Sequence, residues 1–339
     1  MAIPRSSASH RVGRMISCLI LPGVTVIAAC DQRTASTVEP ARTVDTSFAP
    51  AIEDPAFEAG EGPLVCFDEA HNNFHTLNGT YIPFGLVLRA DGYTLRPVRE
   101  RLSSAALQPC RIFVIADAQP PARRGDPPTF SPEEIVALEA WVREGGSLFV
   151  ITDHMPDPGA IEDLAEAFDI EVNNGYVLNG TRPEDQGPIV FRTDDGTSVP
   201  ETPTTTQALT TADRIADDVV TRGRTPDEAV QVVATFAGAG FRASKSFRPL
   251  LLFGQGRKSW MPEEYWVFPE GTPTQDMSGW SQGGVGEYGE GRLAFFGEAA
   301  MFTAQVFSQG RVRAGMNAPE AEDNLQLLLN VMHWLAGVL

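Results

Sequence analysis

Lysine, cysteine and histidine are scarce in this sequence, and acidic residues outnumber basic ones. Only Lys245 and Lys258 are lysines among 26 basic residues, against 44 acidic residues, which gives a formal net charge of -18. Such a surface should repel nucleic acid and anionic lipid headgroups, so we expect neither as a direct partner. We interpret the preference for arginine over lysine as codon bias without functional meaning.

The apolar run near the N-terminus is too short for a permanent membrane span, and its surroundings are those of a processing signal. Three arginines precede the run, and IAAC ends it. This ending resembles the bacterial lipoprotein signal, in which small residues admit the peptidase and the cysteine receives diacylglycerol. The resemblance implies a signal peptide over 1–29, a lipid anchor on Cys30 and a place in the bacterial cell envelope, on its periplasmic or extracellular face. A secretory signal with an incidental cysteine is the alternative.

Residues 31–61 are rich in Thr, Ser, Pro, Ala and acidic residues and lack apolar periodicity, so we predict a flexible tether after Cys30. Asp31 resembles the inner-membrane retention signal of enteric bacteria, a rule that leaves the choice of membrane open elsewhere. Removal of residues 1–29 takes away three arginines and no acid, so the charge becomes 23 minus 44, or -21. The folded domain is expected over 62–338, long enough for one large α/β domain or one domain with an insertion.

Two cysteines remain when the leader is removed and Cys30 is acylated. Cys66 and Cys110 could pair in an oxidising envelope. Cys66 comes late in its predicted strand and Cys110 opens another, so parallel neighbours would hold them several residues out of step. We therefore predict two buried thiols, neither with the spacing of a zinc knuckle nor in a nucleophile elbow.

Apolar runs alternate with helical patterns as far as about residue 170. RIFVIA and SLFVIT are continuous apolar runs of the kind buried in a parallel sheet. Between them Ser131 caps a helix with Pro132 at its first position, and Gly145 ends it. This alternation predicts a mostly parallel sheet with helices on both faces. Strands are expected at 64–67, 93–98, 111–116 and 147–152, and helices at 81–88, 132–144 and 161–168.

The pattern weakens over about 171–290, where Asn-Gly pairs and short apolar runs such as QVVATFAG and RPLLLFG indicate hairpins and strands. We predict an antiparallel β-rich insertion or extension there. The glycines from Gly279 to Gly291 would suit a mobile loop or a tight hairpin, and the stretch could serve as a substrate lid or be a plain exposed turn. A strand in RLAFFGEAAMF and a closing helix in DNLQLLLNVMHWLAG follow.

Three stretches resemble one family. SPEEIVALEAWVREGGSLFVITDH is similar to the central helix and strand of uncharacterised class I glutamine-amidotransferase-like domains of bacterial envelope proteins. GRLAFFGEAAMFTAQ with DNLQLLLNVMHWLAG is similar to their closing strand and helix, and FDEAHNNFH stands at the first strand. The resemblance covers 62–170 and 290–338, leaves the middle unmatched, and implies a flavodoxin-like sheet with its pocket at the carboxyl ends of the strands.

Active amidotransferases carry a cysteine on the elbow after a central strand. In this sequence RIFVIADAQPP has Asp117 where an elbow would begin, and SLFVITDH also lacks a cysteine. The resemblance therefore implies the fold without amidotransferase chemistry, and the fold alone does not choose a replacement.

Acids and imidazoles follow four of the predicted strands. Because the carboxyl ends of parallel strands meet at one edge of a sheet, we expect these side chains to share a crevice. Three histidines of the mature chain fall in these loops, whereas His333 in the last helix is expected to be packed or exposed rather than functional. The crevice candidates are Asp68, Glu69, His71, Asn72, Asn73, His75, Asp117, Asp153, His154 and Glu298.

Two chemical interpretations compete for this crevice. His71, His75 and His154, together with carboxylates, could hold a divalent metal such as zinc, with bound water as the nucleophile. Without a metal, the carboxylates with Asn72 and Asn73 could bind a sugar or another polyol, against the flat wall of Phe74.

Chemistry without a cofactor is also open, because His71, Asp153 and His154 could serve as acid and base in a hydrolysis. In a third interpretation the same histidines brace loops or cap helices, Glu298 caps the helix after it, and Asp117 pairs with Arg123 or Arg124. Our working prediction is an envelope lipoprotein that binds a small polar ligand in this crevice. A hydrolase and a non-catalytic scaffold or assembly protein are the alternatives, so whether the protein is an enzyme stays open.

Overall fold

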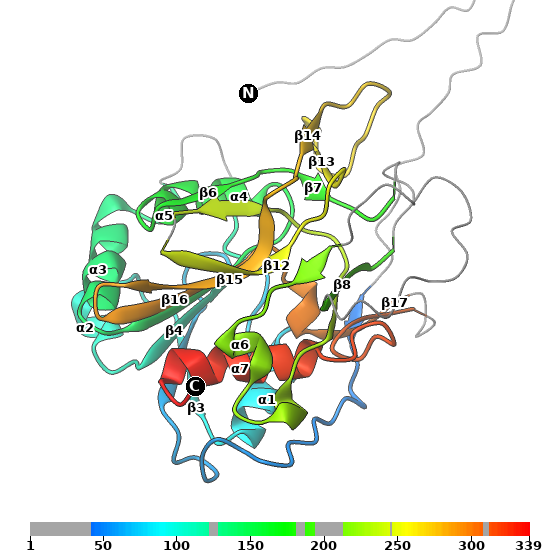
Figure 1. Ribbon diagram of the computed structural model, residues 1–339. Coiled ribbons are helices and arrows are strands. Elements are labelled where there is room, and N and C mark those ends of the chain that lie inside the picture. The colour runs from blue at the N-terminus through cyan, green and yellow to red at the C-terminus, as the bar shows by residue number, and fades with distance from the viewer. Residues whose placement is uncertain (1–41, 122–127, 181–186, 194–212, 245, 308–311) are drawn as a thin grey trace, which may run out of the picture. The chain divides into compact units, whose positions relative to one another are not determined.

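Parallel strands form the half of the main sheet that carries the candidate crevice (Figure 1). The computed structural model describes residues 42–121, 128–180, 187–193, 213–244, 246–307 and 312–339. The predicted signal peptide and Cys30 lie outside these residues. The parallel strands lie in the order β3 (Thr94–Val98), β2 (Leu64–Asp68), β4 (Ile112–Ala116), β5 (Ser147–Ile151) and β16 (Gly291–Phe296).

This order is the 2-1-3-4-5 order of flavodoxin-like sheets, so the predicted fold class is confirmed. Ala116 pairs with Ile151, and Ile151 pairs with Phe296. Strands β4, β5 and β16 therefore end in step, and the residues that follow them emerge side by side.

A mostly antiparallel half continues the same sheet beyond β16, as predicted for about 171–290. β15 (Ser281–Tyr288) pairs with β16, and the sheet then continues through β12 (Phe247–Leu252), β9 (Arg214–Ile215), β8 (Ile189–Thr193) and β10 (Val232–Thr235), with β8 and β9 paired in parallel. β11 (Phe241–Ala243) pairs with β15 and with β6 (Ile170–Val172). Two small sheets comprise β1 (Thr43–Val44), β17 (Ala304–Phe307) and β18 (Val312–Gly315), and β7 (Tyr176–Val177), β13 (Lys258–Trp260) and β14 (Thr274–Asp276).

Helices cover both faces of the parallel half. α1 (Ile82–Ala90) and α7 (Asn324–Ala336) pack on one face, and α2 (Ser104–Leu107), α3 (Pro132–Arg143) and α5 (Glu162–Glu166) pack on the other. The short elements are α4 (Asp157–Ala160), α6 (Val219–Arg222), η1 (Pro226–Glu228) and η2 (Ala300–Phe302). No helix among the residues that the structure describes has the length and apolar character of a membrane span.

Local sequence sets the ends of the two long helices. Ser131 accepts a hydrogen bond from the backbone of Glu134, whose side chain accepts one from the Ser131 backbone, so α3 begins with a capping box. Gly145, with φ of 110°, follows the end of α3, and Gly337, with φ of 83°, ends α7. A left-handed residue after a helix is favourable for glycine, which has no Cβ.

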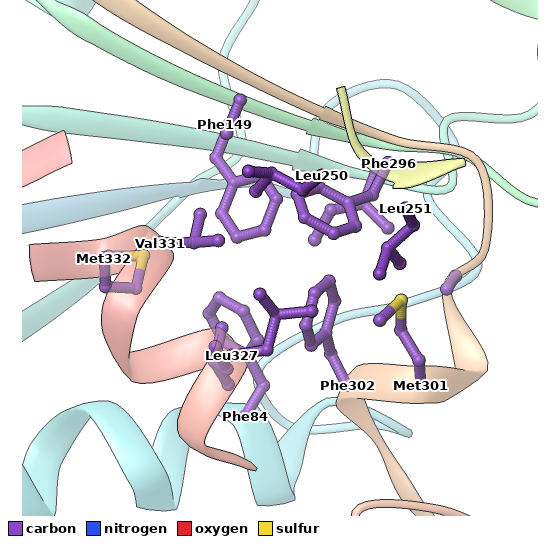
Figure 2. Close-up of a cluster of buried hydrophobic side chains, with 14 of the residues drawn as sticks. Phe84, Phe149, Leu250, Leu251, Phe296, Met301, Phe302, Leu327, Val331 and Met332 are labelled. Atoms are coloured by element: carbon purple, nitrogen blue, oxygen red, sulfur yellow. The ribbon is translucent and has the colours of Figure 1, made fainter. Parts of the chain in front are cut away.

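The larger core lies between the sheet and the face that carries α1 and α7. Figure 2 shows side chains of β5, β12 and β16 above those of η2 and α7, with Phe84 of α1 beside them. The ring of Phe149 lies edge to face against Phe296 and Phe302, with both pairs of centroids 5.7 Å apart. Burial of one such side chain contributes about 1.5–3 kcal/mol, so this layer holds the sheet edge in place.

The glycine-rich stretch forms a buried strand, so the expected mobile loop or exposed turn is wrong for most of it. The expected tight hairpin is confirmed, because β15 and β16 pair antiparallel around a two-residue turn at 289–290. A Cβ on Gly283 would meet the ring of Phe296 at 2.4 Å, and one on Gly284 would meet the ring of Phe247 at 2.5 Å. The glycines therefore make room for aromatic rings packed against the strand.

The prediction of two free thiols is also wrong, because Cys66 and Cys110 form a disulfide with their Cα atoms 5.7 Å apart. Cys66 is in register with Phe113, so the offset along the strands was expected correctly. However, Cys110 lies before β4 and not in it, where the chain leaves α2, and there its side chain reaches Cys66.

Part of the predicted tether is docked on the domain. Within 42–61, β1 pairs with β17, and the partly buried Phe48, Ile52 and Phe57 pack against the core. The Ala56 amide donates to Asp91, and Phe57 lies 5.1 Å from the ring of Tyr93. The composition of 42–61 suggested a free linker, but three well-spaced apolar residues suffice to hold it.

Candidate functional site

The carboxyl ends of β2, β4, β5 and β16 bring the predicted acids to one edge of the sheet, but in two separate groups. Asp68, His71, Asn73 and Glu134 form a group that we call the His71 network. Asp117, Asp153, Asp157 and Glu298 form a second group that we call the acid cluster. Every one of these side chains except Asn73 is buried.

The His71 network uses nearly all of its polar atoms internally. His71 Nδ1 donates to Asp68 at 2.8 Å, and His71 Nε2 donates to Glu134 Oε1 at 3.0 Å. Asn73 donates to Asp68 Oδ2 at 3.0 Å and to the carbonyl of Ala116 at 3.2 Å. Phe130 stacks on the imidazole with centroids 4.1 Å apart. Neither ring nitrogen of His71 is left for a metal, a proton transfer or a ligand.

Glu134 anchors this network and was absent from the predicted site. It accepts from the backbone amides of Ser131 and Leu102, both at 2.9 Å, and from Arg101 at 3.0 Å. Burial alone would lower the pKa of His71, but the bonds and charges of Asp68 and then Glu134 outweigh it and raise that pKa. His71 is therefore an imidazolium that joins the end of β2 to the start of α3, as the bracing interpretation expected.

The acid cluster is differently organised. Asp117 follows β4, Asp153 and Asp157 follow β5, and Glu298 follows β16. Burial is the largest cause that raises the pKa of all four carboxyl groups, and repulsion from Asp153 adds to it at the other three. The pKa of Asp157 rises to about 7. Burial therefore favours the protonated form of these acids more than that of exposed carboxyls, and a protonated carboxyl can donate as well as accept hydrogen bonds.

Asp117 stands in a strained backbone conformation, with φ of 54°. A left-handed conformation costs a residue with a Cβ about 1–3 kcal/mol and persists where the surrounding structure requires it. The resemblance to amidotransferase-like domains implied that an elbow would begin here, and this chain has a carboxylic acid at that turn.

Several buried polar atoms at this edge have no hydrogen-bond partner among the described residues. They include Asp117 Oδ1, Thr152 Oγ1 and Gln282 Nε2. A Cβ on Gly238 would meet both Gln282 Nε2 and Glu298 Cβ at 2.9 Å, so the amide of Gln282 lies beside Glu298. Because a buried unpaired polar group is costly, such atoms indicate a place for water or a ligand.

Aromatic rings surround His154. Its imidazole stacks on Tyr176 at 4.7 Å, and Trp266 lies edge-on at 4.9 Å. His154 Nδ1 donates to the carbonyl of Met155 at 2.9 Å. Trp266 comes from a turn closed by a bridge between Glu264 and Val267 and has φ of 55°.

His75 and Tyr81 lie between the acid cluster and the core. His75 Nδ1 bonds to Thr80 at 2.6 Å, and its Nε2 lies 3.6 Å from Asp117 Oδ2. Burial, helped by the charge of Arg42, lowers the pKa of His75 to about 3, so this imidazole is neutral. The hydroxyl of Tyr81 donates to the carbonyl of Ala299 at 2.9 Å. Burial raises the pKa of Tyr81, and the charges of Asp117, Glu298 and Asp153 raise it further.

Arg42 brings a positive charge to the rim of the acid cluster. Its guanidinium lies 5.3 Å from the ring centroid of Phe74. Burial raises the pKa of Asp117, Asp153 and Asp157, and the charge of Arg42 acts against it at all three, after the larger opposing effect of His154 at Asp153 and Asp157. Phe74 and Tyr265 are the large exposed aromatic side chains at this rim, with 43% and 49% of their surface accessible.

Glu69, Asn72 and Glu298 make mainly local contacts. Glu69 accepts from the backbone amide of Leu77 at 3.1 Å and pairs with Arg99 at 2.8 Å. Asn72 is exposed and occupies a left-handed turn, with φ of 53°. The proposed partners of Asp117, Arg123 and Arg124, lie outside the described residues. Glu298 accepts from the amides of Ala300 and Met301, as a residue capping the next turn would.

Sequence reasoning missed Asp157, Tyr81, Glu134 and Gln282. Asp157 had a signal, because DHMPD places it four residues after Asp153 in the same loop. Glu134 completes the capping box of α3, and its second role depends on the path of β2. Nothing in the sequence marks Gln282, which lies in the glycine-rich stretch.

The predicted metal site has no geometric support within the residues that the structure describes. No three His, Cys, Asp or Glu side chains there are grouped to hold a metal ion. His71, His75 and His154 each belong to a different local contact set.

The side chains of the acid cluster are buried. A hollow of about 530 Å³ lies by β9 and α6, lined by residues such as Arg214 and Asp217, and another of about 280 Å³ lies by α5 and β6. Neither of these two hollows includes a member of the acid cluster.

Comparison with known proteins defines the fold and no more. No family model matches the chain, and no curated protein matches its sequence. The N-terminal domain of mmIFT52 is similar over 80% of this chain and 96% of its own, with 16% identity and a TM-score of 0.51. The cytoplasmic protein STM1381 of Salmonella typhimurium LT2 covers 80% and 98%, with 13% identity and a TM-score of 0.45. A ThuA-like protein of Bacteroides uniformis covers 84% and 95%, with 10% identity and a TM-score of 0.42.

Proposed function

We propose that this protein is an envelope-anchored binding domain whose ligand is a small polyhydroxylated molecule, such as a carbohydrate, held at the acid cluster. The observation that carries the proposal is the set of unpartnered polar atoms at the carboxyl edge of the sheet, with Asp117 Oδ1 and Gln282 Nε2 as examples. Ligands of open α/β sheets bind outside this edge.

The chemistry of the cluster suits hydroxyl groups. Protonated carboxyls donate one hydrogen bond and accept others, which matches a hydroxyl that does both. The pKa of Asp157, about 7, lets this group serve in either form. Tyr265 and Trp266 add flat apolar faces, against which a sugar ring can lie.

Amidotransferase chemistry is not part of the proposal. The turn after β4 carries Asp117, and the turn after β5 carries Asp153 and His154. Neither turn holds a thiol that could attack an amide carbon.

The envelope location rests on two features. The IAAC ending of the leader supports Cys30 as the lipid anchor. The disulfide between Cys66 and Cys110 is stable in oxidising compartments such as the periplasm and is rare in the cytosol. Labelling of whole cells with a fatty acid tests the anchor: the wild-type protein is expected to label and Cys30→Ala is not, and a labelled Cys30→Ala protein would refute it.

A thermal-shift screen of purified protein with neutral sugars and polyols tests the binding function. At least one compound is expected to raise the melting temperature of the wild type in a saturable manner. Asp153→Asn should reduce that shift, whereas Arg99→Ala, at the same edge but outside the cluster, should preserve it. If no sugar or polyol changes the melting temperature, the proposed function is wrong.

A hydrolase is the second candidate, because Asp117 and Asp157 interact directly and repulsion from Asp153 helps to raise both of their pKa values. Such paired carboxyls can act as acid and base near neutral pH. Product formation from a ligand found in the screen would be expected to disappear in Asp157→Asn. A ligand that binds and is not converted to product would exclude the hydrolase for that ligand and support binding as the only function.

A further inference from the structure

We propose that the Cys66–Cys110 disulfide is a site of thiol–disulfide exchange, in which a dithiol reductant attacks Cys110 and Arg96 stabilises the Cys66 thiolate that leaves. The reductant is identified by its chemistry, as a molecule or protein that presents two reactive thiols. Exchange opens and recloses the covalent link between β2 and the end of α2. The disulfide packs on the face of the sheet that carries α2 and α3, so this inference is independent of the ligand at the acid cluster.

The register of the sheet holds Arg96 beside Cys66. Cys66 of β2 pairs with Arg96 of β3, the strand at the edge of the main sheet. Residues paired across neighbouring strands direct their side chains to the same face of a sheet. Arg96 Nη2 lies 3.3 Å from Cys66 Sγ and 3.5 Å from Cys110 Sγ. The strand pairing therefore places a cation in contact with both sulfur atoms.

The guanidinium of Arg96 is poorly satisfied while the disulfide is intact. Nη2 donates to the carbonyl of Ala106 at 3.2 Å and to the two sulfur atoms, and none of these three acceptors carries a negative charge. Nε is buried and has no hydrogen-bond partner within the part of the chain that the structure describes. Because a buried donor without an acceptor is costly, most of all in a charged group, an anion beside Arg96 would be stabilising. Reduction supplies that anion as a thiolate.

Cys110 also has a partner in place for its reduced form. Its Sγ lies 3.5 Å from the carbonyl oxygen of Ala106 in α2. A disulfide sulfur has no hydrogen to donate to this carbonyl, whereas a thiol does. The reduced protein would therefore hold a Cys66 thiolate beside Arg96 and a Cys110 thiol beside Ala106, with both partners already positioned.

Exposure determines which sulfur atom is attacked. Cys66 is fully buried, whereas Cys110 keeps 7% of its surface accessible at the point where the chain leaves α2. An incoming thiolate therefore reaches Cys110, and Cys66 becomes the leaving group. Arg96 favours this direction, because a sulfur leaves faster when a nearby cation stabilises it as a thiolate.

The exchange balances in two steps. First, a thiolate of the reductant forms a bond to Cys110 Sγ, the bond between Cys110 and Cys66 breaks, and its electron pair stays on Cys66 Sγ. Second, the other thiol of the reductant attacks the reductant's own sulfur in the mixed disulfide and displaces Cys110, which takes up a proton. The reductant becomes a disulfide, the protein gains two electrons, and the second proton goes to solvent because Cys66 stays ionised.

Redox titration of the full-length protein tests the inference. The protein is equilibrated at pH 7 with mixtures of reduced and oxidised dithiothreitol, and the thiols of Cys66 and Cys110 are trapped by alkylation and counted by peptide mass spectrometry. Arg96→Met removes the charge and keeps a long apolar side chain. This variant is expected to lower the equilibrium constant for reduction at least tenfold, which corresponds to about 30 mV for a two-electron couple.

Arg99→Met is the matched control, because Arg99 directly follows β3, is mostly exposed and pairs with Glu69. Its equilibrium constant for reduction should stay within about twofold of the wild-type value, since a distant exposed charge is screened by solvent. An Arg96→Met protein that folds normally and is reduced as readily as the wild type would overturn the inference.

A second readout does not require a folded Arg96 variant. Fully reduced wild-type protein at pH 7 should show the ultraviolet absorption of one thiolate per chain more than reduced Cys66→Ala, and Cys110→Ala should keep that absorption. Circular dichroism should show that the reduced wild type stays folded. Equal absorption of the wild type and Cys66→Ala, or loss of the fold on reduction, would overturn the inference and leave the proposed function standing.

Discussion

The His71 network and the acid cluster lie at the same edge of the same sheet and are built from the same kinds of side chain, yet they differ in one respect. In the network, both nitrogens of His71 and both oxygens of Glu134 have partners. In the cluster, Asp117 Oδ1 and the nearby Gln282 Nε2 have none within the described part of the chain. The position of a residue at a sheet edge therefore indicates a candidate, and the satisfaction of its polar atoms indicates whether it is available to a ligand.

The largest expected effect comes from disrupting the His71 network. His71→Ala removes the cation between Asp68 and Glu134 and leaves two buried carboxylates facing each other. Loss of one partner of a buried charged group typically costs about 3–5 kcal/mol of unfolding free energy. Urea unfolding followed by circular dichroism measures this cost, and a loss below about 1 kcal/mol would show that the network is not the brace described here.

The His71 network should also make the stability of the protein depend on pH. The pKa of His71 is raised in the folded state, so its contribution to stability is fully present below the unfolded value of 6.5. It is lost as the pH rises through the folded value. The unfolding free energy of the wild type should therefore fall above neutral pH. The difference between the wild-type and His71→Ala curves of unfolding free energy against pH should isolate the contribution of His71.

The second-largest effect on stability is expected at Asp157 of the acid cluster. The pKa of Asp157 rises from 3.8 to about 7, so the folded state binds the proton more tightly and stability falls as the pH rises through this window. Asp157→Asn is neutral at every pH and should be more stable than the wild type at pH 8, by about 4 kcal/mol at most. At pH 4 the two proteins should be nearly equal. Parallel stability curves for the two proteins would contradict the shifted pKa.

A pair of matched substitutions sharpens the comparison at a smaller scale. Thr152→Val removes a buried hydroxyl that has no partner, and Thr303→Val removes one that donates to Ala300 at 2.7 Å and accepts from Gln305 at 2.8 Å. The first should be neutral or stabilising, and the second should cost about 1 kcal/mol or more. Thermal unfolding of both variants provides the measurement, and equal losses would show that the hydroxyl of Thr152 has a partner after all.

The smallest effect on stability is expected at Arg99, beside the His71 network. Arg99 pairs with Glu69 at 2.8 Å but is mostly exposed, with 63% of its side chain accessible. Arg99→Ala should therefore change the unfolding free energy by less than about 1 kcal/mol. A larger loss in urea unfolding would mean that Glu69 belongs to the buried network.

Periodicity and capping residues were enough to predict the strands, the long helices and the edge where the acids gather. Those features depend on neighbours in sequence, as the capping box of Ser131 and Glu134 illustrates. The disulfide was missed because the position of Cys110 depends on how α2 delivers the chain to β4. The glycines of β15 misled because their partners, Phe247 and Phe296, lie on neighbouring strands.

The division of the crevice into two groups could not be predicted from the sequence either. FDEAHNNFH contains three members of the His71 network, but their partner Glu134 lies 63 residues beyond His71. Asp117 was expected at an elbow, and its positive φ agrees with that expectation. Which polar atoms stay unpaired is settled only by the packing of α3, β15 and the turn that carries Trp266.

The most direct measurement is a crystal structure of the protein soaked with the tightest-binding compound from the sugar screen. The account predicts ligand density within hydrogen-bonding distance of Asp117, Asp153 or Gln282, with the His71 network unchanged. Ligand bound at the His71 network, or a cluster that holds only ordered water while the ligand binds elsewhere, would contradict it.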